Sequence, residues 1–425
     1  MSLQLLVIMV PVLFGFMGFA IDLGRMYLVR GEINQAANAM ALAAAGQLSG
    51  STAADANTLS VMPPPLGTGP SYNYNFGTVG IGVGSGILTS NINPPACFTT
   101  VSDASSGGGN STDCADPTAQ FVNVTVTADA PLLFWSLLPG AESRKTTIAA
   151  QAVAGISAPL CTACNIVPIG ILSLDDTDTV NFGFGDPTTS PVYSFYYSCT
   201  GTPPTILSGS HPYFVLNRND TNSSLTENDQ IFSDSAVGIA ASATPNPDAA
   251  NASTPFACVN IGDTEQTWDV ATPRACSTVA PPLTSVQSAM CGLSSRIANT
   301  DPGNCAIAVE DYASLAANLP FDSDTSVMVP GAPYSGYAGN GRRIITAAII
   351  AQADGITVLG FRQFLIMPVF NDGATTFVPT DVYGRFPALY IGNPTPVRSG
   401  WFDARFANSC PVGAFSGPGK VVLHQ

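Results

Sequence analysis

The sequence MSLQLLVIMVPVLFGFMGFAIDLGRMYLVRGEINQAANAMALAAAGQL, residues 1–48, determines how this chain is organised. No charged side chain occurs between Leu3 and Ile21, and Gln4 is the only polar amide in that stretch. About 19 such residues, rising about 1.5 Å each in a helix, span roughly the hydrocarbon thickness of a bilayer. We therefore predict a helix that can enter a membrane.

The helix is expected to continue past Ile21 with a different character. From Leu23 to Ala44, apolar or small residues recur in steps of three and four, with Arg30 as the one polar interruption. This spacing places them along one side of a helix, which we call the seam. The many alanines favour the helix, and their small side chains allow close packing. Gly46 and the glycine at position 50 mark the expected end of the helix. The residues expected to pack against helices of other copies are Leu6, Val10, Pro11, Phe14, Gly15, Gly18, Asp22, Met26, Ile33, Ala37, Met40 and Ala44.

Residues 11–48 resemble the N-terminal region of the TadE/TadG-like Flp pilus-assembly proteins, which are bacterial pilin-like proteins related to the type IV pilus machinery. The family pattern is a proline, an apolar run containing glycines, Asp-x-Gly, an aromatic residue, a basic residue and an alanine-rich helix. Asn38 replaces the acidic residue that is usual in that helix, and Met40 replaces a usual alanine. The pattern is carried here by Pro11, Gly15, Gly18, Asp22, Gly24, Tyr27, Arg30, Ala36, Ala37, Ala39, Ala41 and Leu42.

Three further points concern the resemblance. It is weaker over residues 122–155, where such proteins often carry a strand, an apolar stretch and an alanine-rich strand. Type IV pilins resemble one another in having a glutamate five residues into the mature helix, and Leu5 stands there if Met1 is the first mature residue. No short basic leader ending in glycine precedes the apolar run, which fits either a processed form of the chain or a shortened start.

The composition favours an exposed extracellular protein. Charged residues make up 10% of the 425 residues, against about 25% in ordinary soluble proteins, and Gly and Pro are abundant. Hydroxyl, amide and backbone groups therefore cover much of the surface. The net charge of −15 argues against a nucleic acid partner, because phosphate binding needs clustered Lys and Arg.

The cysteines are even in number and, with an exported type of N-terminus, are expected to form disulfides. Their connectivity does not follow from the sequence, but Cys97 and Cys114 are the best local pair because they close a Ser/Gly-rich loop. The ten cysteines are Cys97, Cys114, Cys161, Cys164, Cys199, Cys258, Cys276, Cys291, Cys305 and Cys410.

Two smaller groups of these cysteines have alternatives. Cys276, Cys291 and Cys305 are expected to contribute one more local bridge. Cys161 and Cys164 form a Cys-x-x-Cys pair that could be redox-active or bind a metal. A structural role is favoured, because the chain has no second Cys-x-x-Cys motif and no histidine near this one.

The predicted fold is α+β: the long apolar helix is followed by a large, disulfide-containing and mainly antiparallel β domain. We expect three parts, namely the helix at 1–48, a loop-rich linker with a first β region at 49–160, and the main β-rich domain at 161–425. Apolar runs or alternating patterns predict strands at 121–127, 146–156, 165–172, 342–353, 356–370 and 417–425, and a helix within 281–301. Further expectations are a Gly-spaced strand pair at 78–92, a flexible tip at 102–114, and a buried turn or short helix at 130–140.

The sequence offers no set of catalytic residues, and we expect neither an enzyme nor a bound cofactor. His211 and His424 are the only histidines, and no GxSxG, HExxH or phosphate-loop motif occurs. The loop at 217–229 is rich in oxygen ligands but lacks the spacing of a calcium loop, so a solvated loop is favoured. Asn-x-Ser/Thr sequences make glycosylation a modest hypothesis at Asn110, Asn123, Asn219, Asn222 and Asn251.

Two functions remain open at this point. In the favoured one, the chain is a structural subunit of an extracellular pilus-like filament on a bacterial surface. Its helix leaves the inner membrane and packs with copies of itself, using Tad or type IV pilus-type machinery. In the alternative, the helix stays in the inner membrane and anchors a periplasmic assembly component of a Tad system.

Overall fold

The computed structural model describes most of the N-terminal third of the chain and several separate segments beyond it. It divides into two compact units: Met1–Ser157 together with Val421–Gln425, and Ala158–Lys420. The chain thus leaves the first unit after Ser157 and returns to it at Val421. The described residues are 2–74, 77–79, 90–107, 110–135, 145–157, 162–163, 167, 169–189, 191–198, 210–215, 259–262, 293, 333–339, 341, 343–355, 357–367, 382–396 and 419–424.

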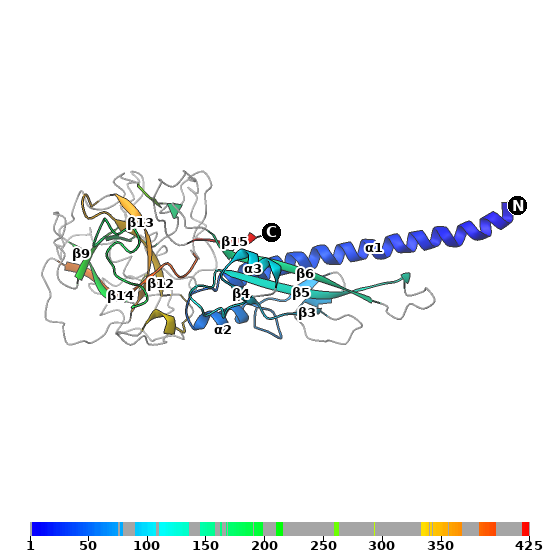
Figure 1. The fold of residues 1–425 in the computed structure, drawn as a ribbon, viewed down its shortest axis with the longest axis horizontal. Helices are drawn as coiled ribbons and strands as arrows, with labels where there is room; N and C mark the ends of the chain where they lie inside the picture. Colours follow the sequence, from blue (N-terminus) through cyan, green and yellow to red (C-terminus); the bar gives the residue numbers. More distant parts are fainter. Residues whose placement is uncertain are drawn as a thin grey trace, which may run out of the picture. The chain divides into compact units, whose positions relative to one another are not determined.

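The predicted long helix is present as α1, Ser2–Ala45, which is 44 residues long and contains Pro11. It ends where the sequence predicted, since Gly46 follows it in a turn and donates its backbone N–H to the carbonyl of Leu42 at 3.0 Å. Its first half extends beyond the sheet of its own unit, as Figure 1 shows.

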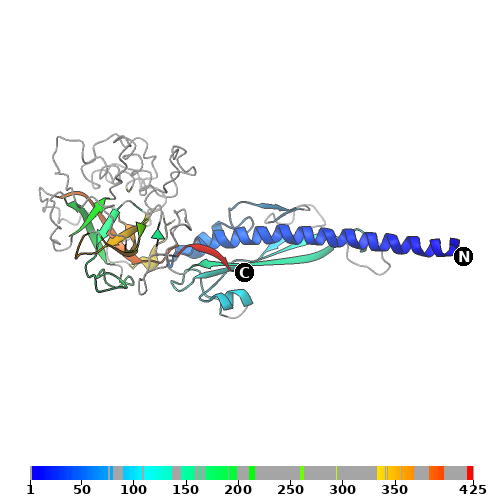
Figure 2. The same cartoon turned by 90° about the horizontal axis from the view of Figure 1, so that it is seen from above.

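The second half of α1 lies along an antiparallel sheet built on a long hairpin of β5, Phe121–Pro131, and β6, Lys145–Ile156. The C-terminal strand β15, Val421–His424, pairs with β6, while β3, Ser90–Ile92, and β4, Ala96–Phe98, pair with β5. Figure 2 shows the helix running along this sheet. The predictions of strands at 121–127 and 146–156 and of a final strand are confirmed.

Small and branched side chains explain why helix and sheet pack closely. Along β5, Val122, Val124 and Val126 are fully buried, and β6 contributes Ala152 and Ala154 to the same core. Alternation along a strand places such residues on one face. Because alanines line β6, the backbone of α1 can approach it closely, and this face covers the apolar seam of the helix.

The structure adds local detail to three sequence predictions for residues 49–114. The expected flexible tip begins with a short helix, α3, Val101–Ser106, which Thr100 caps by accepting the N–H of Asp103 at 3.2 Å. The strand pair predicted at 78–92 lies mostly outside the described residues, and its two described ends pair elsewhere: β2, Gly77–Val79, with β1, Tyr72–Tyr74, and β3 with β5. Finally, α2, Ala53–Ser60, lies in a region predicted to be loop-rich.

The second unit contains a closed barrel with the strand order β10-β8-β12-β13-β14-β9. Most neighbouring strands are antiparallel, and two pairs, β10 with β9 and β12 with β8, are parallel. The bounds are β8 Ile169–Leu172, β9 Val192–Ser198, β10 Ser210–Val215, β12 Ile344–Ile350, β13 Val358–Ile366 and β14 Val382–Gly392. Outside the barrel lie β7 Thr162–Ala163, β11 Val259–Asn260 and the 3₁₀ helix η4 Tyr334–Gly336.

The strands predicted from the apolar runs at 165–172, 342–353 and 356–370 are confirmed as β8, β12 and β13. A turn joins the last two, with Gly355 at a φ of 70°. Aromatic side chains fill the barrel, and the rings of Phe195 and Phe364 meet edge-on at 5.3 Å between centroids. The predicted helix at 281–301 lies outside the described residues except for Leu293, which is helical and buried.

Among the described residues of the second unit, Arg343 and Arg362 are buried cations, and backbone carbonyls accept hydrogen bonds from both. Arg362 on β13 donates from Nε to the carbonyl of Val180 at 3.0 Å, and its guanidinium lies 4.4 Å from the centre of the Phe182 ring. Tyr390 donates from its hydroxyl to Asn181 Oδ1 at 2.9 Å, and burial raises the pKa of this tyrosine to about 12. These contacts fix the segment around 180–182 on the barrel.

Candidate functional site

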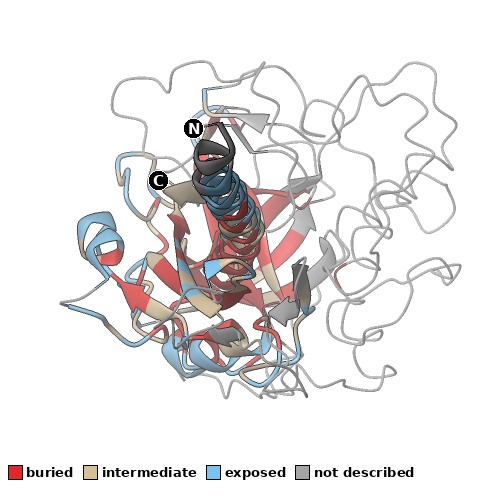
Figure 3. Ribbon diagram, turned by 90° about the vertical axis from the view of Figure 1, so that its right-hand side faces the viewer, coloured by how far each residue is buried: buried red, intermediate tan, exposed pale blue. Residues whose placement is uncertain are grey.

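The protruding half of α1 is the most unusual surface of the first unit. Its large apolar side chains are exposed rather than buried, with Phe16 the most exposed at 70%. Figure 3 shows this part of the helix in the colour of exposed residues. Within the described part of the chain, α1 is the one helix long and apolar enough to cross a membrane. The exposed set is Val7, Met9, Val10, Val12, Leu13, Phe14, Phe16, Met17, Phe19 and Ile21.

Four of the residues predicted to mediate packing fall in this exposed half: Val10, Pro11, Phe14 and Gly15. Full burial of one Val, Leu, Ile, Phe or Met side chain is favourable by about 1.5–3 kcal/mol relative to leaving it exposed to water. The exposed half therefore has a strong tendency to enter lipid or to pack against other apolar surfaces. Leu6 lies in α1, and its side chain is outside the described residues.

Four other predicted packing residues belong to the core of their own unit. Ile33, Ala37, Met40 and Ala44 are 0% exposed and pack in one cluster with the apolar face of β5 and β6. Met26 is half-buried against the same cluster. The seam seen in the sequence is real, but the chain's own sheet occupies it.

The boundary between the two halves of α1 is marked by Asp22, which is only 3% exposed. Its carboxylate accepts three backbone N–H groups from the segment directly after β5, residues 132–135, which we call the hairpin tip. Oδ1 accepts from Leu133 at 2.9 Å, and Oδ2 accepts from Phe134 at 3.0 Å and from Trp135 at 2.9 Å. Hydrogen bonds to a charged group are stronger than neutral ones, so this contact fastens the hairpin tip to the helix.

Gly18 lies one helical turn before Asp22 and makes room for the same tip. A Cβ atom added at Gly18 would lie 2.3 Å from Cγ of Phe134, which no real side chain tolerates. At Gly15 and Gly24, by contrast, an added Cβ would meet nothing within 4 Å. Gly18 and Asp22, predicted to pack against other copies, thus contact residues of their own chain.

The buried turn or short helix predicted at 130–140 is described only as far as Trp135. Trp135 is helical, but Leu133 is 51% exposed and Trp135 is 49% exposed, so these two side chains are not buried. Sequence reasoning also missed the contact between the tip and α1. The available signal was Asp22, because a carboxylate directly after an uncharged helical run needs hydrogen-bond donors, although its neighbours in sequence do not identify them.

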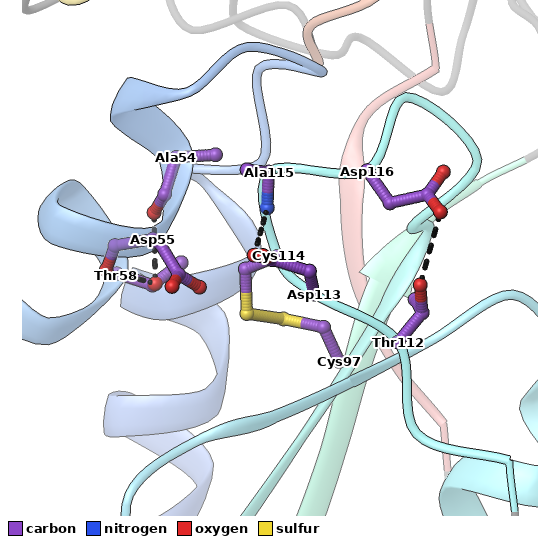
Figure 4. The surroundings of a disulfide bond; sticks show 9 residues. All are labelled: Ala54, Asp55, Thr58, Cys97, Thr112, Asp113, Cys114, Ala115 and Asp116. Atoms are coloured by element: carbon purple, nitrogen blue, oxygen red, sulfur yellow. Dashed lines mark hydrogen bonds between the residues drawn. A yellow bond between two sulfur atoms is a disulfide. The ribbon is translucent and has the colours of Figure 1, made fainter.

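The predicted disulfide between Cys97 and Cys114 is present, and Figure 4 shows its surroundings. The disulfide lies beside α2 (Figure 4). On α2, the pKa of Asp55 is raised mainly by burial and secondly by the negative charge of Asp113. Thr112 donates to Asp116 Oδ2 at 3.0 Å, which braces the same loop. The remaining cysteines lie outside the described residues: Cys161, Cys164, Cys199, Cys258, Cys276, Cys291, Cys305 and Cys410.

The possible glycosylation sites differ in their exposure to solvent. Asn123 lies on β5, is 5% exposed and donates from Nδ2 to the carbonyl of Ala104 at 2.5 Å, so the folded chain cannot carry a glycan there. Asn110 is exposed. Asn219, Asn222 and Asn251 lie outside the described residues, as does the loop at 217–229.

No group of three or more potential metal ligands occurs among the residues that the structure describes. His211 lies on β10, where its ring meets Tyr193 edge-on at 4.9 Å between centroids. Burial lowers the pKa of His211 below its ordinary value. A buried, neutral imidazole in an aromatic setting is a core residue of the barrel.

Comparison with known proteins supports the resemblance seen in the sequence. Residues 2–47 match the family model described as "Putative Flp pilus-assembly TadE/G-like". This match covers α1 and does not extend to the sheet or the barrel. No curated protein and no solved structure matches the chain.

Proposed function

We propose that this chain is a structural subunit of an extracellular pilus-like filament. Before assembly, α1 is inserted in the inner membrane of the cell. During assembly, the exposed half of the helix leaves the lipid and packs against the same half of neighbouring copies. The Tad or type IV pilus-type machinery carries out this transfer.

One observation carries the proposal: α1 is divided into an occupied half and an unoccupied half. Val29, Ile33 and Met40 are 0% exposed within the first unit, whereas Phe14 and Phe16 are 59% and 70% exposed. A helix that served only as a core element of its unit would not extend so far beyond the sheet. The match of residues 2–47 to a pilus-assembly family supports the same interpretation.

An inner-membrane-anchored assembly component is the second candidate. The size of the second unit, Ala158–Lys420, favours it, because so large an addition must be accommodated around a filament axis. In that case α1 stays in lipid permanently, and the rest of the chain lies in the periplasm. In both candidates α1 is inserted in the membrane; they differ in whether it later leaves the lipid.

Fractionation of the native host separates them. Cell-surface fibres are sheared off and purified, and their proteins are identified by mass spectrometry in parallel with the membrane fraction. The proposal predicts this chain as a main protein of the fibres. Its recovery from membranes alone would support the anchored component and contradict the filament.

A further inference from the structure

The hairpin tip, residues 132–135 directly after β5, presents apolar side chains to solvent. Leu133 and Trp135 are each about half exposed, although the sheet behind them is well buried. Among the described residues outside α1, only Val101, Val180 and Val192 are other large hydrophobic residues exposed to a similar degree. Two such side chains within three residues therefore form a local apolar surface that α1 does not cover.

The position of the tip along α1 is fixed by Asp22. Residues 2–21 contain no charged side chain, and 20 helical residues extend about 30 Å, the thickness of the hydrocarbon core of a bilayer. Asp22 is the first charge after that stretch. Because its carboxylate accepts the N–H groups of 133–135, the tip lies at the level where the helix would leave the hydrocarbon.

We propose that residues 132–135 enter the interfacial layer of a phospholipid bilayer beside the helix that spans it. The inference rests on the membrane-inserted state of the proposed function. Its occupant is lipid because the tip continues the apolar surface of α1 at the end of its membrane-spanning length. The hairpin would then set the depth and the rotation of the helix in the membrane.

The polar groups of the tip are compatible with this environment. A backbone N–H without a partner is costly near hydrocarbon, but those of Leu133, Phe134 and Trp135 are already bonded to Asp22. The nearest charges on the described strands neutralise each other, since Lys145 Nζ lies 2.5 Å from Asp129 Oδ2. The region between them and the tip, residues 130–135, carries no charge.

The aromatic residues at this level are the types found at membrane interfaces. Trp and Tyr are enriched there because their rings are apolar and their N–H or O–H groups can bond to water or headgroups. Trp135 is 49% exposed on the tip, and Tyr27 is 67% exposed slightly more than one helical turn beyond Asp22. Both lie close in position to Asp22, the residue at which α1 would leave the hydrocarbon.

Depth-dependent quenching of tryptophan fluorescence tests the proposal on the full-length chain in phosphatidylcholine vesicles. The chain has three tryptophans, so Trp268→Phe and Trp401→Phe leave Trp135 as the only emitter. Vesicles contain lipids brominated either near the headgroup or near the bilayer centre. We expect Trp135 to be quenched several-fold more by the shallow bromines, at every protein-to-lipid ratio.

Two matched probes make the result decisive. In a Trp135→Phe background, Phe14→Trp reports the helix and is expected to be quenched by the deep bromines, while Val180→Trp on the second unit stays unquenched. If Phe14→Trp is quenched and Trp135 is not, the interfacial role of the tip is wrong while membrane insertion stands. If Trp135 loses its exposure only at high protein density, a second copy covers the tip and the lipid proposal is overturned. If neither probe is quenched, membrane insertion fails and the inference fails with it.

Discussion

The carboxylate of Asp22 accepts the backbone N–H of Phe134 at 3.0 Å, although 112 residues separate them in the chain. Two further N–H groups, from Leu133 and Trp135, reach the same carboxylate. The contact joins the middle of α1 to the segment that follows β5. It also separates the half of α1 that the sheet covers from the half that is exposed, so it fixes how much of the helix is available to lipid or to other copies.

Replacement of this carboxylate is expected to release the hairpin tip. In Asp22→Asn the negative charge is lost and a single amide oxygen remains as an acceptor, so three charge-assisted hydrogen bonds are weakened or lost. At about 1.5–3 kcal/mol for such bonds, the amides of 133–135 should exchange with solvent roughly 10- to 100-fold faster. Hydrogen exchange followed by mass spectrometry measures this. Arg30→Gln, a charge change at an exposed position of the same helix, should leave these rates unchanged.

Gly18 and Gly15 form a matched pair for the close approach of Phe134. A methyl group at Gly18 would overlap the Phe134 ring, so Gly18→Ala should displace the tip and cost about 1–3 kcal/mol of unfolding free energy. Gly15→Ala meets nothing and should be neutral or stabilising by about 0.5–1 kcal/mol, because alanine favours the helix. Urea unfolding in mild detergent compares the two. Equal effects of both variants would show that the tip does not pack at Gly18.

Two isoleucines on one helix test the division of α1. Ile33 is 0% exposed in the core with β5 and β6, whereas Ile21 is 41% exposed. Ile33→Ala should lower the free energy of unfolding by about 2–5 kcal/mol, since it removes buried methyl groups and leaves a cavity. Ile21→Ala should change it by less than about 0.5 kcal/mol. Similar losses at both positions in detergent unfolding curves would argue against an exposed first half.

The disulfide between Cys97 and Cys114 is expected to contribute to the stability of the first unit. A bridge over a separation of 17 residues restricts the unfolded chain, which is worth about 3 kcal/mol. The double variant Cys97→Ser, Cys114→Ser should therefore lose about 3 kcal/mol of unfolding free energy and show a lower urea midpoint. Both cysteines are replaced together because a single replacement leaves a free thiol that can pair with other cysteines. An unchanged midpoint would mean that α3 and β4 hold the loop without the bridge.

The sequence predicted the elements of this fold more reliably than their partners. The uncharged run before Asp22, the seam through Ile33 and Met40, and the alternation in β5 each report local geometry, and each element is present. What covers the seam could not be predicted, because an apolar stripe on a helix looks the same whether a sheet or a second helix packs on it. The contact of Asp22 with the hairpin tip depends on chain segments far apart in sequence, so no local pattern encodes it.

The central claim is that the exposed half of α1 packs against the same half of neighbouring copies in a filament. Photo-crosslinking from Phe16, replaced by p-benzoylphenylalanine, tests it most directly in cells that assemble surface fibres. The account predicts crosslinked dimers and higher multimers of this chain within the sheared fibres, joined through residues of the first half of α1. The same substitution at Val180, which is 60% exposed on the second unit, should give no such helix-linked products. Crosslinks from Phe16 only to lipid, or to other membrane proteins in the membrane fraction, would contradict the claim.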